Sequence, residues 1–138
     1  MIYLLDTSAV LAHFFAEPGG LEVAELLQDG KDAVALAAPT WVELERKLSG
    51  LIPDATEAQR VFLHYTRTLC SLVPLDEAAA LAAIRIHCAS PIRLPMVDAL
   101  IAGCAAAAGL TLVHRDSHMD AIPTGELTVL RLPDRRSV

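Results

Sequence analysis

The segment PMVDALIAGCAAAAG, residues 95–109, is apolar on every side except at one charged residue, Asp98. A helix that is apolar all around belongs in a protein core. Pro95 suits the start of such a helix, and Gly109 suits its end. The next residues, LTLV at 110–113, indicate a buried strand, so this region predicts a helix packed on a parallel sheet. An ionised carboxylate costs several kcal/mol in a core unless cations or hydrogen-bond donors surround it, so Asp98 needs partners from elsewhere in the chain.

The length and composition indicate one α/β domain. The 138 residues fit a single domain, 1–138, whose core is large enough to need no disulfide or structural metal. Hydrophobic residues make up 54% of the chain and aromatic residues only 4%, so Ala, Leu and Val must form closely packed helices over a sheet. The three cysteines, Cys70, Cys88 and Cys104, show no metal-ligand spacing, and we expect them to be core thiols in a reducing cytosol.

Charge and hydropathy exclude two broad classes of function. The apolar run over 94–114 is about long enough to span a bilayer, but it contains Pro95, Asp98 and two glycines, which a buried α/β unit explains better. The first ten residues lack the basic start and long apolar region of a signal peptide, so we expect a cytoplasmic protein without membrane association. The net charge of −6 argues against general coating of nucleic acid, because phosphate binding needs basic surface.

Short apolar runs alternate with helical segments along the chain. The expected strands are 2–5, 33–37, 71–75, 110–113 and 127–132. The expected helices run from Thr7 or Ser8 to about Ala16, over 19–30, over 39–50, from Asp54 or Thr56 to Leu69, from Asp76 to about Ala89, and over 95–109. This order predicts an open parallel sheet with helices on both faces. Residues 133–138 are expected to be a flexible tail.

Four acids are candidate site residues, and three of them lie at a strand end or in the first turn of a helix. They are Asp6, Glu43, Asp98 and Asp116. Taken singly, each has a structural explanation: Asp6 could cap the first helix, and Glu43 could pair with Lys47. Asp98 could favour the positive end of its helix dipole, and Asp116 could shape a turn. Ligands of open α/β sheets bind beyond the carboxyl ends of strands, however, and carboxylates gathered there repel one another unless a hard cation such as Mg²⁺ or Mn²⁺ lies between them.

The four acidic motifs together resemble a known family. They are LLDTSAVL at 4–11, WVELERKL at 41–48, PMVDALIAGCAAAAG at 95–109 and LVHRD at 112–116. In this order they are similar to the motifs of PIN-domain ribonucleases, and the short chain resembles the VapC toxins of toxin–antitoxin pairs. The resemblance implies a sheet order of 3-2-1-4-5 and a metal-binding quartet formed by Asp6, Glu43, Asp98 and Asp116. This sequence departs from the family pattern at His114, because many relatives have Thr or Ser before the last acid. Asp120, four residues after Asp116, is a candidate fifth acid or a substitute for the fourth.

The resemblance implies an endoribonuclease that uses Mg²⁺ or Mn²⁺, and the chemistry of the residues agrees. A divalent cation held by carboxylates lowers the pKa of a bound water and offsets the charge that develops on a phosphate. Because the quartet includes no His or Cys, it suits Mg²⁺ or Mn²⁺ over Zn²⁺. We expect Asp6, Asp98 and Asp116 to be the principal ligands, and Glu43 to be a ligand or to orient water. His13, His64, His87 and His118 show no ligand spacing with one another and are expected to be structural or surface residues.

The resemblance also implies partners: an RNA substrate, a second copy of the chain, and a VapB-like antitoxin whose tail crosses the active-site groove. The largely apolar segments 19–28 and 57–73 could receive an amphipathic stretch of such a partner. Arg46, Lys47 and Arg115 could contact phosphate, but they are equally well explained as ordinary helix and turn charges. Thr7 and Ser8, at a helix start, could present backbone N–H groups to a phosphate.

Other functions remain open from the sequence. A haloacid-dehalogenase type of phosphotransfer enzyme would need a second Asp two residues after Asp6, where Ser8 stands, and no GxGxxG motif follows any strand. The alternatives within the family are a PIN-type RNA-processing nuclease that is not a toxin, and a PIN module that binds RNA or protein without cleaving.

Overall fold

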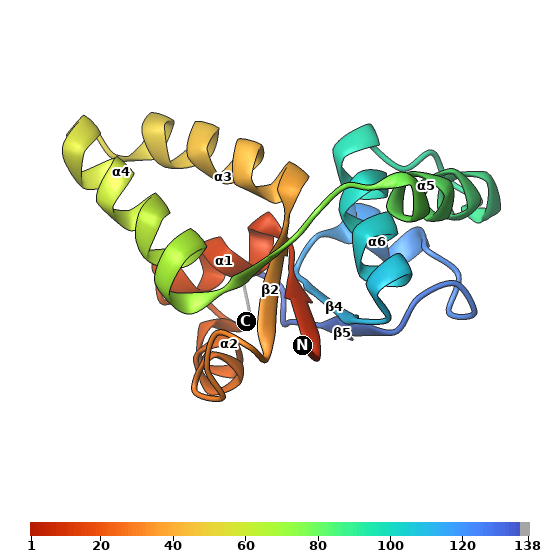
Figure 1. Cartoon of the computed structure of the whole chain (residues 1–138), viewed down its shortest axis with the longest axis horizontal. Helices are drawn as coiled ribbons and strands as arrows, with labels where there is room; N and C mark the ends of the chain where they lie inside the picture. The colour runs from red at the N-terminus through yellow and green to blue at the C-terminus, as the bar shows by residue number, and fades with distance from the viewer. Residues whose placement is uncertain (136–138) are drawn as a thin grey trace.

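The centre of the molecule is a five-stranded sheet, seen in a computed structural model that describes residues 1–135 (Figure 1). The strands are β1 (Tyr3–Leu5), β2 (Val34–Ala37), β3 (Ser71–Val73), β4 (Thr111–His114) and β5 (Val129–Arg131). All four neighbouring pairs are parallel, and the order is β3-β2-β1-β4-β5. The expected sheet order is therefore confirmed.

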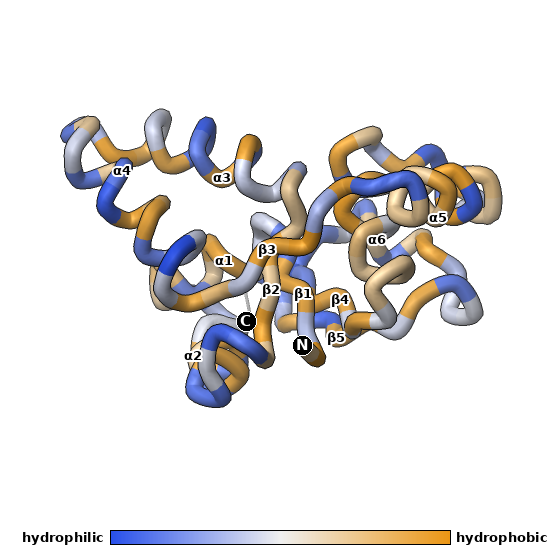
Figure 2. Tube along the Cα trace, in the orientation of Figure 1, coloured by the Kyte–Doolittle hydropathy of each residue, from blue (hydrophilic) through white to orange (hydrophobic). Residues whose placement is uncertain are grey.

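Helices cover both faces of the sheet (Figures 1 and 2). The three central strands, β1, β2 and β4, are mostly buried, whereas the edge strands β3 and β5 are partly exposed. One layer holds α1 (Thr7–Phe14), α2 (Gly20–Leu27), α3 (Ala38–Leu51) and α4 (Ala55–Leu63). The other layer holds α5 (Glu77–Ala89) and α6 (Met96–Ala108). Successive side chains of a strand point to opposite faces. Leu5 of β1, with its neighbours Leu36 and Val113, therefore packs in the α1–α4 core, whereas Leu4 and Leu112 pack in the α5–α6 core.

The two helices of the second layer approach each other very closely. A Cβ atom on Gly103 of α6 would lie 2.5 Å from the carbonyl oxygen of Ala79 and 2.7 Å from the Cβ of Ala83, both in α5. The small residues of α6 therefore let it pack closely against α5, and its buried residues share a core with Leu4 and Leu112 of the sheet. This packing positions the first turn of α6, which carries Asp98.

Several helix boundaries differ from the sequence-based expectations. Asp6, rather than Thr7 or Ser8, caps the first helix, because its extended backbone lets its carboxylate accept the N–H of Ala9. The helix expected to reach Leu69 is α-helical only to Leu63 and continues as a π-helical segment, η1 (His64–Leu69). A short 3₁₀ helix, η2 (Ser117–Ala121), connects β4 to β5.

The cysteines and the chain end complete the comparison with the sequence. All three cysteines are free thiols; Cys70 and Cys104 are buried as expected, but the prediction for Cys88 is wrong, because it is exposed on the face of α5 opposite Ile86. Of the predicted tail, residues 136–138 lie outside the described residues, and Arg135 donates a hydrogen bond to Glu17 at 3.0 Å.

Within residues 1–135, no helix has the length and apolar character needed to cross a membrane.

Candidate metal centre

Asp6 lies where β1 ends and α1 begins, and its carboxylate is only 2% exposed. Its Oδ1 accepts hydrogen bonds from the hydroxyl of Ser8 at 2.7 Å and from the backbone N–H of Ala9 at 2.8 Å. Burial outweighs these two hydrogen bonds and, with added repulsion from Asp116 and Asp98, raises the pKa of Asp6 from 3.8 to about 7. The charged form of Asp6 is thus disfavoured unless a cation approaches it.

Asp98 is the second buried carboxylate, placed by the first turn of α6 and 7% exposed. Burial, followed by repulsion from Asp116 and Glu43, raises the pKa of Asp98 from 3.8 to about 6. The opposing contributions of His118 and Lys47 are smaller. The acid that the sequence left without a partner therefore lies among other acids, whose repulsion outweighs the positive charge near it.

Asp116 follows β4, the strand that pairs with β1, so Asp116 and Asp6 lie at the same edge of the sheet. The carboxylate caps η2: its Oδ1 accepts the backbone N–H of His118 at 2.9 Å. The imidazole of His118 turns back over the same carboxylate, with Nδ1 3.1 Å from Asp116 Oδ1 and 3.8 Å from Asp98 Oδ2. Asp98, Asp116 and His118 each offer one ligand atom, and these three atoms lie within 4.8 Å of one another.

His118 corrects the sequence interpretation, which placed it among structural or surface residues. Its side chain is 62% exposed, as expected for a surface residue, but its Nδ1 also lies near carboxylate oxygens of two of the four acids, which the sequence did not reveal. The sequence offered one signal for this contact, which is that His118 lies two residues after Asp116. This spacing brings the two side chains together only because a tight turn, η2, follows β4 directly.

The remaining expected site residues divide into two groups. Glu43 is half-buried on α3 and near enough to Asp98 to raise its pKa. Asp120 instead faces Arg131, with its two carboxylate oxygens each 3.2 Å from guanidinium nitrogens. The structure thus places Asp98 and Asp116 at ligand distance from each other, places Asp6 and Glu43 near enough for their charges to interact with this pair, and directs Asp120 to an ion pair with Arg131.

The expected phosphate contacts also behave differently from one another. The hydroxyl of Ser8 joins β4 to the site, because it accepts the backbone N–H of Arg115 at 2.8 Å while donating to Asp6. The guanidinium of Arg115 is 2.9 Å from the Glu17 carboxylate and donates to the carbonyl of Pro18 at 3.3 Å. Arg115 is therefore held within the protein. The hydroxyl of Thr7 is buried and has no hydrogen-bond partner within residues 1–135.

His114 is the residue at which the sequence departs from the family resemblance. It is fully buried, and its Nδ1 accepts the backbone N–H of Asp116 at 3.1 Å. Burial lowers the pKa of His114. A neutral imidazole with its proton on Nε2 is the form that can accept this bond, so His114 holds the backbone of Asp116 as a hydroxyl oxygen would.

The donor set fits a divalent metal ion. Ligand atoms of Asp98, Asp116 and His118 lie within 4.8 Å of one another, and Asp6 lies near enough to both acids for their charges to raise its pKa. The pKa values of Asp6 and Asp98 are raised mainly by burial, and for Asp98 the positive charges of His118 and Lys47 offset this only in part. A bound cation would relieve this repulsion and keep both groups ionised.

Comparisons with known proteins agree with this geometry. The PIN domain family matches residues 3–124, and the chain therefore belongs to the PIN domain family. The fold is similar to that of a chain in the VapBC2 complex from Rickettsia felis bound to a promoter DNA fragment, with 17% identity, a TM-score of 0.77, and coverage of 96% of this chain and 100% of that one.

Two further solved structures have the same fold. The match to DNA-bound VapBC from Salmonella typhimurium has 17% identity and a TM-score of 0.76 and covers 95% and 98% of the two chains. The match to VapBC-5 from Mycobacterium tuberculosis has 21% identity and a TM-score of 0.69 and covers 94% and 98%. No curated protein matches the sequence.

Proposed function

We propose that this chain is a metal-dependent endoribonuclease that acts in the cytoplasm as the toxin of a VapBC-like toxin–antitoxin module. The observation that carries the proposal is the meeting of Asp6, Asp98 and Asp116 at one edge of the sheet, with the pKa values of the first two raised. Membership of the PIN family supports nuclease chemistry, and the similarity to chains of VapBC complexes supports the toxin role.

In this proposal, some residues of the site bind the metal ion, one orients water, and others position the ligands. Asp6 uses Oδ1 for both of its hydrogen bonds, which leaves Oδ2 for a cation. Asp98 and Asp116 supply further carboxylate oxygens, and Glu43 holds or orients a water. When bound, Mg²⁺ or Mn²⁺ would supply a water of lowered pKa and offset charge on the scissile phosphate. Ser8 and His114 keep Asp6 and Asp116 in place from behind.

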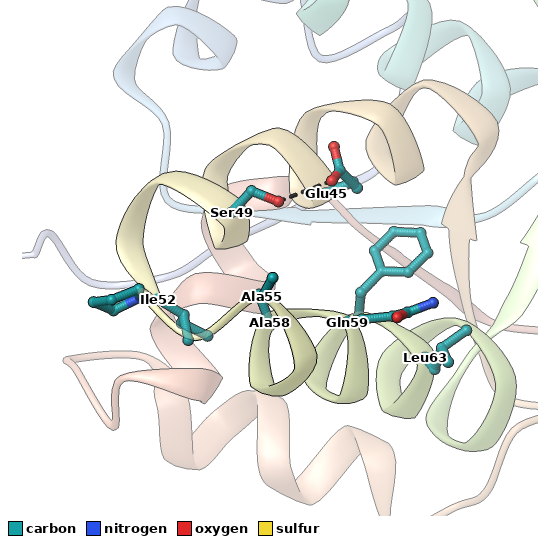
Figure 3. A pocket seen from close by; sticks show the side chains of 9 residues that line it. Glu45, Ser49, Ile52, Ala55, Ala58, Gln59 and Leu63 are labelled. Carbon is teal, nitrogen blue, oxygen red and sulfur yellow. Dashed lines mark hydrogen bonds between the residues drawn. The ribbon is translucent and has the colours of Figure 1, made fainter.

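An antitoxin would need a groove on the toxin, and one lies between α3 and α4 (Figure 3). Its walls are mainly apolar and include Ile52, Ala58, Phe62 and Leu63, with Glu45 at the edge. Most of the α4 wall lies within the predicted segment 57–73, although Ala55 precedes it, and the opposite wall is formed by α3 rather than by the predicted segment 19–28. We propose that a VapB-like segment with apolar and basic side chains docks here and that the toxin also forms homodimers.

Cleavage assays with purified protein test the enzymatic part. Single-stranded and structured RNAs are incubated with Mg²⁺ or Mn²⁺, and we expect cleavage that a chelator abolishes. RNA that stays intact with demonstrably folded protein would contradict catalysis, and RNA binding without cleavage would identify a binding module.

Expression in a bacterial host tests the toxin part. We expect growth arrest that co-expression of the product of a short upstream reading frame relieves. Cleavage without growth arrest, and without such a reading frame, would instead indicate an RNA-processing nuclease.

A further inference from the structure

The side chain of His118 lies where a metal ligand would lie. Its Nδ1 is 3.1 Å from Asp116 Oδ1 and 3.8 Å from Asp98 Oδ2. Ligand atoms about 2.1 Å from a common ion are about 3.0 Å apart when adjacent and about 4.2 Å apart when opposite, from ordinary coordination distances. Both separations from Nδ1 fall within this range, and all three candidate ligand atoms lie within 4.8 Å of one another, so small side-chain movements let them share an ion.

The turn that carries His118 is well anchored although the ring is exposed. The backbone N–H of His118 donates to Asp116 Oδ1, and the next residue, Met119, is buried and donates its N–H to the Asp116 carbonyl at 3.0 Å. The side chain of His118 is 62% exposed, so it needs little desolvation to bind a cation. The anchored backbone therefore holds the imidazole over the two carboxylates.

We propose that His118 is a nitrogen ligand of the metal centre and that it gives the centre a preference for ions that accept imidazole over Mg²⁺. The inference rests on the proposed metal centre and deepens it. Imidazole nitrogen suits later transition ions such as Co²⁺, Ni²⁺ and Zn²⁺, whereas Mg²⁺ favours oxygen ligands. A site of carboxylates alone would not make this distinction as strongly.

The competing role for His118 is that of an internal counter-charge, which would only occupy the space between the carboxylates. The two roles predict opposite results for His118→Ala. Loss of a ligand weakens Co²⁺ binding, whereas loss of a competing internal cation strengthens the binding of every divalent ion.

Calorimetric titration of the full, untagged chain with Co²⁺ and with Mg²⁺ separates these roles. For His118→Ala we expect the Kd for Co²⁺ to rise about tenfold or more, since even residues behind a ligand contribute this much, and the Kd for Mg²⁺ to change less than about twofold. His87→Ala is the matched control, because His87 is also exposed but lies on α5. Thermal melting of both variants without metal checks that they are folded.

Pulsed electron paramagnetic resonance of the Mn²⁺-loaded protein provides a second readout that a structural role would not change. We expect ¹⁴N coupling in the wild type and in His87→Ala, and its loss in His118→Ala. Two results together would overturn the assignment of His118. In His118→Ala the affinity for Co²⁺ would be unchanged, or both ions would bind more tightly, and the wild type would show no ¹⁴N coupling. A wild-type protein that binds none of these ions would overturn the metal centre itself.

Discussion

The first turn of α6 and the body of the same helix differ in what they contribute to the protein. In the first turn, Asp98 is a buried carboxylate whose pKa is raised to about 6. Five residues later, Gly103 packs against α5 so closely that a methyl group does not fit. The body of the helix packs closely in the core, whereas we expect the buried carboxylate of its first turn to destabilise the metal-free fold. Separation along one helix lets the two properties be changed independently.

The largest effect that follows from this difference concerns cleavage. Asp98→Asn keeps the shape of the side chain but removes a proposed ligand, so we expect the rate of RNA cleavage to fall about a hundredfold or more. Asp76→Asn is the matched control: Asp76 is an exposed N-cap whose carboxylate accepts the N–H of Ala79 at 2.9 Å, and Asn caps helices equally well. Initial cleavage rates of both variants at equal metal concentration measure this. Equal losses in both would show that the helix starts, rather than the site, limit activity.

The next effect is the gain in stability on binding metal. A ligand that binds only the folded state stabilises it by about 2.7 kcal/mol at a concentration a hundredfold above its Kd. We expect this gain for wild type and for Gly103→Ala, whose change lies in the body of α6, and a much smaller gain for Asp98→Asn. Thermal melts with and without Mn²⁺ measure it. A full gain for Asp98→Asn would remove Asp98 from the ligand set.

A change in the body of α6 is expected to act on stability alone. Gly103→Ala places a methyl group against the Ala79 carbonyl and should lower the free energy of unfolding by about 2 kcal/mol, as overpacking of a core does. Gly50→Ala on α3 is the control, because nothing lies within 4 Å of its added Cβ and Ala favours a helix. Urea denaturation of the two variants gives the comparison. A neutral Gly103→Ala would mean that α5 and α6 can separate without cost.

The sequence predicted the elements better than their ends. All five expected strands overlap the observed ones, since short apolar runs between helical segments are a local signal. The third strand stops at Val73 instead of reaching residue 75, because Pro74 has no N–H to donate to a neighbour. The sheet order came from the resemblance to the PIN family and was not visible in the apolar pattern itself.

In the candidate site, too, the sequence predicted features that depend on a local pattern and missed features that depend on tertiary structure. Asp98 was found because a lone charge in an apolar helix breaks a local pattern. The contact of His118 with two acids, the pairing of Arg115 with Glu17 and the pairing of Asp120 with Arg131 depend on which strands are neighbours and how each turn closes. Such contacts are decided by tertiary structure, so charge and spacing in the sequence did not distinguish them from free surface residues.

The smallest expected effect is the pH dependence of the metal-free protein, and it tests whether the first turn of α6 is destabilising. The pKa of Asp98 is about 6 in the folded protein and near 3.8 when unfolded, so between these values the folded state holds more protons than the unfolded state. The free energy of unfolding must therefore fall as pH rises from about 4 to about 7. Asp98→Asn removes this contribution to the pH dependence, although the new buried amide itself needs hydrogen bonds. We therefore expect the free energy of unfolding of Asp98→Asn to exceed that of wild type by about 1–2 kcal/mol at pH 7.5 and by little at pH 4. Urea denaturation with chelator at both pH values measures the difference. Asp6 adds a pH dependence of its own in both proteins, and it changes only slightly in Asp98→Asn because repulsion from Asp98 is the smallest cause of its raised pKa. If Asp98→Asn unfolds well before wild type at pH 7.5, Asp98 stabilises the start of α6, and the contrast between the two parts of the helix is wrong.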